Sequence, residues 1–231
     1  MSKLNEFIKV FQGNPTNLFA MLGLALLVVA FLVIRKVKFT TRLITQIAIA
    51  LALSTVLDMF KLFRAPFGGD VTIGAMVPIL LLAIVYGPEV GFITGFLYGI
   101  ISLILGPYVV HPVQLLFDYP LAFMALGLAG YVSKSNSLGN LVAKCTKSDK
   151  KSTKSIIVVN VIATIVGILG RFICHFISGV VFFASDTPAG MSTYLYSFLY
   201  NISHLGIDAI ICLVIISLIP VGQLRKILIR N

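Results

Sequence analysis

The chain has 231 residues, of which 58% are hydrophobic and only 11% are charged, and its mean hydropathy is +1.03. Ordinary soluble domains carry about 25% charged residues, so this composition excludes a soluble protein and indicates an integral membrane protein. A net charge of +10 would suggest nucleic-acid binding in a soluble chain. Here the basic residues cluster between apolar segments, which is typical of a topology signal, and we expect no nucleic-acid partner.

Apolar stretches that are long enough to cross the roughly 30 Å hydrocarbon core of a bilayer as helices recur along the chain. Seven are expected, at 17–34, 41–60, 71–87, 90–106, 112–133, 155–183 and 194–219. The first is followed by Arg35, Lys36 and Lys38, which is the wrong side for a cleaved signal peptide, so we interpret it as a retained helix. The prediction is an all-α polytopic membrane protein in the lipid bilayer of the cell membrane.

Basic residues are concentrated in three of the segments that connect these spans. Four lie in 35–42, six lysines lie in 134–154, and the C-terminal tail carries Arg225, Lys226 and Arg230. The other connections are together almost neutral. By the positive-inside rule the basic segments are cytoplasmic, which predicts an N-terminus outside and a C-terminus in the cytoplasm. The 134–154 segment is rich in Lys, Ser and Asn, so we expect a basic, flexible cytoplasmic loop there.

Small residues form two rows that predict close approach of helices. One row has a period of four and consists of Gly87, Gly91, Gly95 and Gly99. A second small-residue face, Ala48 and Ala52, lies in the second span. The rows have two interpretations, close packing within the bundle or a docking surface for another subunit.

Ionisable and amide side chains inside membrane spans are costly, and they mark candidate functional sites. The candidates are Asp118, Arg171, His175, Asn201, His204 and Asp208. Counting from the ends of their spans places Asp118, His175 and Asn201 at a similar depth in the outer half of the membrane, so we expect them to converge. A purely structural interpretation is also open for three of these residues: a satisfied interhelical hydrogen bond for His175, and for Arg171 and Asp118 a mutual salt bridge, which could coexist with function.

Aromatic residues surround this polar layer. Arg171, His175, Gly179 and Phe183 are spaced four apart and share one helix face. The tyrosines of the same outer layer are Tyr108, Tyr119, Tyr194, Tyr196 and Tyr200. Any one of them could instead belong to the aromatic belt at the membrane interface. Together, the layer predicts a pocket for a small, flat, polar or cationic molecule that enters from outside.

Motifs for bond-making chemistry are missing from the sequence. There is no Gly-x-x-x-x-Gly-Lys-Ser/Thr loop, no Gly-x-Ser-x-Gly elbow and no His-Glu-x-x-His helix. Cys145, Cys174 and Cys212 fit neither a disulfide nor a metal pattern. We therefore expect a binding protein with no enzymatic activity, no ATPase of its own, no cofactor and no metal.

Two blocks of the sequence resemble the thiamine-binding S component of energy-coupling factor (ECF) transporters. The first is Gly-Pro-Tyr-Val-Val-His-Pro-Val-Gln at 106–114 with Asp-Tyr-Pro-Leu-Ala-Phe at 118–123. The second is Arg-Phe-Ile-Cys-His-Phe-Ile-Ser-Gly at 171–179, followed by Tyr194, Tyr196, Tyr200 and Asn201. The resemblance covers about residues 41–219. It implies a six-helix vitamin-binding membrane domain at 39–231, preceded by an extension at 1–38 with one additional transmembrane helix.

The same resemblance implies the ligand, the partners and the roles of individual residues. The ligand would be thiamine, and a shared transmembrane coupling subunit with two cytoplasmic ATPase subunits would drive its uptake. Ala48 and Ala52 match the docking face of the family's first helix, and the loop around Phe67, Gly68, Gly69 and Asp70 would act as a lid. The implied substrate-binding residues are Tyr108, Asp118, Tyr119, His175, Gly179, Phe183, Tyr196 and Asn201. The family usually has glutamate at the position of Asp118 and a stacking tryptophan at the position of Phe183.

Two other functions stay open at this point. The first is an S component for a related vitamin precursor such as hydroxymethylpyrimidine, which the absence of tryptophan from the chain favours. The second is a stand-alone proton-coupled secondary transporter, in which Asp118, Arg171, His175 and Asp208 relay protons. The sequence lacks the internal repeats that many such transporters show.

Overall fold

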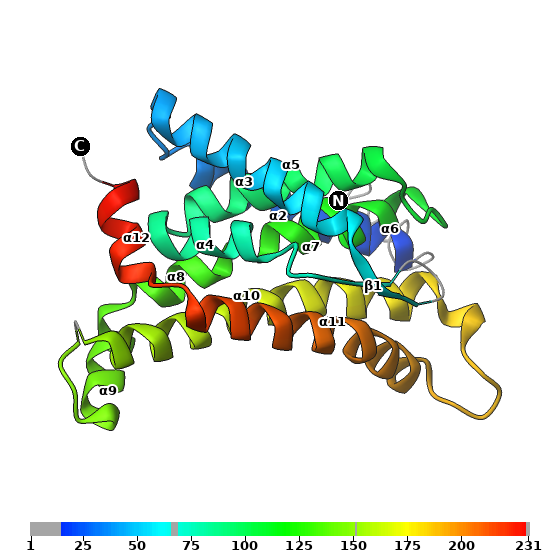
Figure 1. Cartoon of the computed structure of the whole chain (residues 1–231). Helices are drawn as coiled ribbons and strands as arrows, with labels where there is room; N and C mark the ends of the chain where they lie inside the picture. The colour runs from blue at the N-terminus through cyan, green and yellow to red at the C-terminus, as the bar shows by residue number, and fades with distance from the viewer. Residues whose placement is uncertain (1–14, 66–68, 151, 230–231) are drawn as a thin grey trace, which may run out of the picture.

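The computed structural model describes residues 15–65, 69–150 and 152–229, which form an elongated bundle of helices (Figure 1). Within these described residues, five helical segments are long and apolar enough to cross a membrane. They are α3 (Thr41–Met59), α5 (Pro88–Leu105), the segment Pro112–Lys134, α10 (Thr153–Phe182) and α11 (Thr193–Leu218). The apolar helices α2 (Pro15–Ile34) and α4 (Val77–Tyr86) account for the remaining two expected spans. An additional N-terminal helix therefore precedes a six-helix core, as predicted.

The third expected span, 71–87, is helical only in its second part. Its first residues belong to strand β2 (Asp70–Thr72), which pairs antiparallel with β1 (Lys61–Arg64). Gly74, with φ of 83°, turns the chain from β2 toward α4. Because α4 has 10 residues, it is about 15 Å long and reaches across only half of a bilayer core. Most of its side chains are buried among the longer helices, so its ends need not reach both membrane surfaces.

The fifth expected span is a broken helix. In chain order it consists of α6 (Pro112–Leu116), the π-helical turn η2 (Phe117–Leu121), α7 (Ala122–Ala125) and α8 (Leu128–Lys134). Pro120 lies inside η2 and has no backbone N–H, so it cannot continue a regular α-helical ladder. A π turn of this kind frequently marks a functional position, and here it carries Asp118.

The glycine row of α5 packs against this broken helix. A Cβ atom added to Gly99 would lie 2.7 Å from Pro120 Cα, and one added to Gly91 would lie 2.7 Å from Gly127 Cα. A Cβ on Gly95 would overlap the carbonyl group of Phe123. Of the two interpretations of this row, the structure selects close packing within the bundle.

The additional N-terminal helix α2 packs against α5, α6 and η2. The rings of Phe19 and Phe117 meet edge to face with centroids 6.3 Å apart, and Ala30 is buried in the same apolar cluster. Helix α2 therefore shields one face of the core. Ala48 and Ala52 lie exposed on α3, outside the surface that α2 covers.

The 134–154 segment is not the flexible loop that its composition suggested. It contains helix α9 (Asn136–Thr146), which packs against α10. The Ser135 hydroxyl caps the helix by accepting the N–H of Leu138 at 3.3 Å, and Val142 is buried. The composition suggested a loop because the few apolar residues of α9 are spread among many polar ones.

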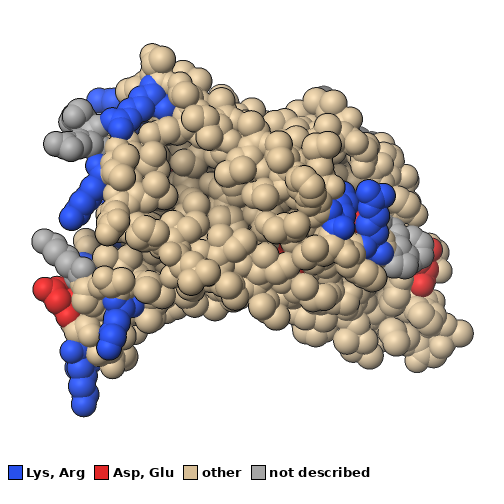
Figure 2. All heavy atoms as spheres, viewed as in Figure 1, with Lys and Arg blue, Asp and Glu red and all other residues tan. Residues whose placement is uncertain are grey.

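The two ends of the bundle differ in charge. Helix α9, the C-terminal helix α12 (Val221–Leu228) and the connection between α2 and α3 lie at one end, on the left in Figure 1. Figure 2 shows most of the visible Lys and Arg side chains at that end, with a smaller group toward the other end, in the region of β1. At this other end of the bundle, the short 3₁₀ turn η3 (Ala184–Asp186) follows α10. The apolar middle between the two groups matches a membrane-embedded bundle.

Candidate ligand-binding site

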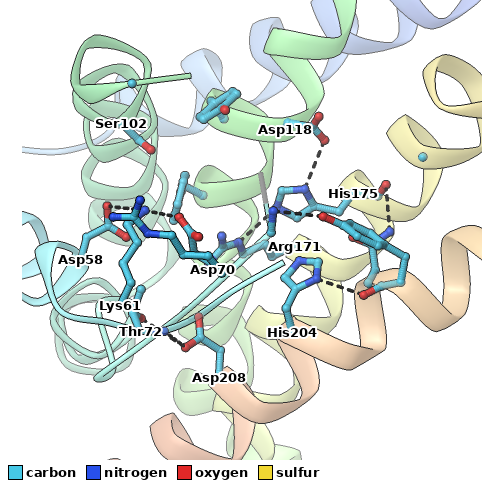
Figure 3. Close-up of a pocket in the computed structure, with 18 of the residues that line it drawn as sticks. Asp58, Lys61, Asp70, Thr72, Ser102, Asp118, Arg171, His175, His204 and Asp208 are labelled. Atoms are coloured by element: carbon cyan, nitrogen blue, oxygen red, sulfur yellow. Dashed lines mark hydrogen bonds and ion pairs between the residues drawn. The ribbon is translucent and has the colours of Figure 1, made fainter. Parts of the chain in front are cut away.

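A cavity of about 460 Å³ opens between α3, the β1–β2 hairpin, α5, η2, α10 and α11 (Figure 3). This volume is in the range of sites for small organic ligands. Seven of the eight predicted binding residues line it, namely Asp118, Tyr119, His175, Gly179, Phe183, Tyr196 and Asn201. Segments that are far apart in the sequence thus meet at one site.

Asp118 of η2 and His175 of α10 lie next to one another at the cavity and point toward each other (Figure 3). His175 Nδ1 lies 3.1 Å from Asp118 Oδ1, and Arg171 Nε donates to His175 Nε2 at 3.3 Å. Because a guanidinium group has no acceptor, Nε2 must be the accepting nitrogen, and Nδ1 carries the proton that is donated to Asp118. Asp118 therefore pairs with His175, and the salt bridge between Arg171 and Asp118 that was the structural alternative is not formed.

The guanidinium group of Arg171 has a second neighbour in the cavity wall. Its Cζ atom lies 4.2 Å from the centre of the Phe123 ring, a cation–π arrangement. The contact holds the cation against α7 and leaves Asp118 without a direct arginine partner. The Asp118 carboxylate and the Arg171 guanidinium group therefore lie in the same site without contacting one another.

Asn201 links α11 to α10 near His175. Its Nδ2 atom donates to the carbonyl of Ser197 at 2.9 Å and to the carbonyl of His175 at 3.4 Å, and its side chain is buried. The Ser197 hydroxyl donates to the carbonyl of Phe176 at 2.9 Å. A Cβ atom at Gly179 would overlap the Ser197 side chain, so glycine is what lets the two helices approach.

Tyr108, the eighth predicted residue, lies behind the cavity wall. Its ring stacks on Phe183 with centroids 6.1 Å apart and an interplanar angle of 24°. Its backbone N–H donates to the Tyr119 hydroxyl at 2.7 Å. Tyr108 thus supports two lining residues. Tyr194 is 66% exposed and lies away from the cavity.

The second half of the cavity wall is strongly charged, and sequence reasoning names only its Asp70, as part of the expected lid. Lys61 forms an ion pair with Asp70 and lies 4.0 Å from Asp58. Arg64 lines the cavity as well. Lys61 and Arg64 gave no signal because they occupy an outer segment whose charges nearly cancel, and only pairing of β1 with β2 brings them to the site. Asp58 lies in the last turn of α3 and was not singled out.

Helix α11 adds His204 and Asp208, which were polar candidates but not predicted binding residues. Thr72 donates to Asp208 Oδ1 through its backbone N–H at 2.8 Å and its hydroxyl at 3.2 Å. His204 lines the cavity and contacts the Tyr200 carbonyl at 3.0 Å. The helical spacing of these two residues relative to Asn201 could have placed them on the same face.

Part of the expected lid is described. Gly69 donates its backbone N–H to the Tyr200 hydroxyl at 3.1 Å, which ties the hairpin connection to α11. Phe67 and Gly68 lie outside the described residues. Among the described residues, no group of three or more His, Cys, Asp or Glu side chains could hold a metal ion.

A multi-helix membrane bundle with a polar, aromatic-lined cavity defines a membrane protein that binds a small molecule. Residues 44–228 match the family described as Thiamine transporter protein (Thia_YuaJ). This chain therefore belongs to the thiamine transporter protein family, which confirms the resemblance noted in the sequence. Membership in a transporter family also agrees with the expectation of a non-enzymatic protein.

Two relatives and one solved structure extend the comparison. The chain is 36% identical over 186 residues to the thiamine transporter ThiT of Bacillus subtilis, covering 79% of this chain and 91% of that protein. It is 29% identical over 148 residues to ThiT of Lacticaseibacillus paracasei, covering 62% of this chain and 70% of that protein. The structure of ThiT from Listeria monocytogenes is 23% identical and matches with a TM-score of 0.58 over 80% of this chain and 93% of that one. The fold is therefore shared with a ThiT structure.

Proposed function

We propose that this chain captures thiamine outside the cell and serves as the substrate-binding subunit of an ECF-type ABC transporter. The observation that carries the proposal is the hydrogen-bonded pair of Asp118 and His175 in the cavity of a chain from the thiamine transporter protein family. Thiamine joins a cationic thiazolium ring to a neutral aminopyrimidine ring. A carboxylate beside an imidazole and aromatic faces suits such a ligand.

Each predicted residue has a role in this proposal. Asp118 supplies the negative charge that balances the thiazolium. His175 and Phe183 offer flat faces to the rings, with Tyr119 at the same wall, while Tyr196 and Asn201 supply hydrogen bonds. Gly179 keeps α10 and α11 close enough for these contacts. Tyr108 acts from behind by supporting Phe183.

The partners and the orientation belong to the same proposal. Ala48 and Ala52 on the exposed face of α3 would dock a transmembrane coupling subunit, and two cytoplasmic ATPase subunits would supply the energy. The basic end of the bundle would face the cytoplasm, which puts the N-terminus and the cavity mouth outside and the C-terminus inside. Residues 1–38 would form an extension to the vitamin-binding domain at 39–231.

Calorimetric titration of the purified, detergent-solubilised chain tests the ligand. The titrants are thiamine, its pyrimidine half, its thiazole half and riboflavin. Tight binding of thiamine without binding of riboflavin supports the proposal. Binding of the pyrimidine half but not of thiamine would instead identify an S component for hydroxymethylpyrimidine.

Uptake into proteoliposomes tests the partnership. The proposal expects uptake only when the coupling subunit, the ATPases and ATP are present. Uptake by this chain alone, driven by a proton gradient, would replace the proposal with a secondary transporter.

A further inference from the structure

Gln114 is a buried amide just outside the cavity wall. Its side chain, on α6, is 1% exposed and does not line the cavity. Its Nε2 atom donates to Asp118 Oδ2 at 2.6 Å and to the Tyr108 carbonyl at 3.1 Å, and its Oε1 atom accepts the N–H of Val110 at 3.1 Å. A glutamine amide has two N–H donors and one carbonyl acceptor. All of these groups are engaged.

The bond to Asp118 restricts how the carboxylate can rotate. His175 binds Oδ1 and Gln114 binds Oδ2, so turning the carboxylate requires that one of the two hydrogen bonds break. Gln114 is a neutral donor, and it therefore orients Asp118 without cancelling its charge. A lysine or arginine in its place would form an ion pair and reduce the attraction for a cationic ligand.

The other two bonds act on the segment that joins α5 to α6. They hold the backbone of Tyr108 and Val110, and the Tyr108 ring stacks on Phe183. One side chain thus connects the acidic group of the site to the support of its aromatic wall.

We propose that Gln114 is a positioning residue for ligand binding, which orients the Asp118 carboxylate and fixes the Tyr108 segment behind Phe183. This inference rests on the proposed function insofar as it concerns thiamine. The hydrogen bonds by which Gln114 holds Asp118 and the Tyr108 segment exist in the ligand-free protein, so they can be tested without any ligand.

The test replaces Gln114 with methionine, which has a similar size but makes no comparable hydrogen bonds. The matched control is Asn160→Leu, because Asn160 is also a buried amide but lies in α10 away from the cavity. In the ligand-free protein, hydrogen exchange of the Val110 amide should accelerate about ten-fold or more in Gln114→Met. It should remain unchanged in Asn160→Leu. Unchanged exchange at Val110 in both variants would overturn the inference.

A double-mutant cycle then tests the action through Asp118. Gln114→Met should weaken thiamine binding about ten-fold or more in the native background. In an Asp118→Ala background the same change should weaken it less than about three-fold, because the group that Gln114 orients is gone. Equal losses in both backgrounds would show that Gln114 acts on binding independently of Asp118, which would overturn its role in orienting that carboxylate. If the native chain binds no thiamine while exchange at Val110 still responds, the proposed function fails and the positioning role stands.

Discussion

The hydrogen bond between His175 Nδ1 and Asp118 Oδ1 joins the last third of α10 to the π turn of η2, across 57 positions of sequence. Arg171 contacts the other ring nitrogen of the same histidine. His175 thus contacts Asp118 through Nδ1 and Arg171 through Nε2, so Asp118 has no direct contact with the Arg171 guanidinium.

Replacing Asp118 with asparagine removes the negative charge of the side chain while keeping its size and shape. The asparagine amide can still accept a hydrogen bond from His175, but the negative charge is lost. We expect thiamine binding to weaken by about 1.5–3 kcal/mol, the usual range for a hydrogen-bonded charged group. Calorimetry with thiamine and with an analogue that carries a neutral ring in place of thiazolium measures the difference. Equal losses for both compounds would remove the countercharge role of Asp118.

Adding a methyl group at Gly179 should disturb the contact between α10 and α11. The new Cβ would overlap the Ser197 side chain, so we expect Gly179→Ala to lower both the thiamine affinity and the melting temperature. Ser197→Gly in the same chain should restore part of each. Gly206→Ala is the control, because a Cβ there would make only ordinary contacts, 3.6 Å from Ile202, and should leave affinity unchanged. A Gly179→Ala chain that matches the native protein in both measurements would contradict the close-packing role.

Tyr200→Phe tests whether the hairpin connection retains the ligand. The change removes the hydroxyl that accepts the Gly69 N–H at 3.1 Å and keeps the ring. Loss of one hydrogen bond of about 1 kcal/mol should speed the dissociation of radiolabelled thiamine several-fold in a chase with unlabelled thiamine. Tyr194→Phe, on an exposed tyrosine of the same helix, should change nothing. Identical dissociation rates in the two variants would show that this contact does not hold the ligand.

Bulky residues on α3 should separate transport from binding. Ala48→Trp and Ala52→Trp each enlarge an exposed face that lies away from the cavity. We expect loss of thiamine uptake in cells with thiamine affinity within about two-fold of native, because docking surfaces need close helix approach. Ala25→Trp, on the exposed side of α2, is the control and should transport normally. Normal uptake by both α3 variants would exclude this face as the docking surface.

Much of the architecture was predictable from the sequence because hydropathy is a local property. Apolar runs located all seven spans within a few residues, apart from the start of 71–87. The cost of polar groups in a membrane singled out Asp118, His175 and Asn201, and the family resemblance supplied the rest of the set. The α9 helix escaped prediction because its apolar contacts depend on α10.

Only the tertiary structure decided which groups meet. The bonds from Thr72 to Asp208 join residues 136 positions apart, and the charged hairpin reaches the cavity only because β1 pairs with β2. The three-way hydrogen bonding of Gln114 likewise depends on where the chain turns before α6. Span length follows from local composition, whereas hydrogen-bond partners follow from helix packing, and helix packing depends on all segments at once.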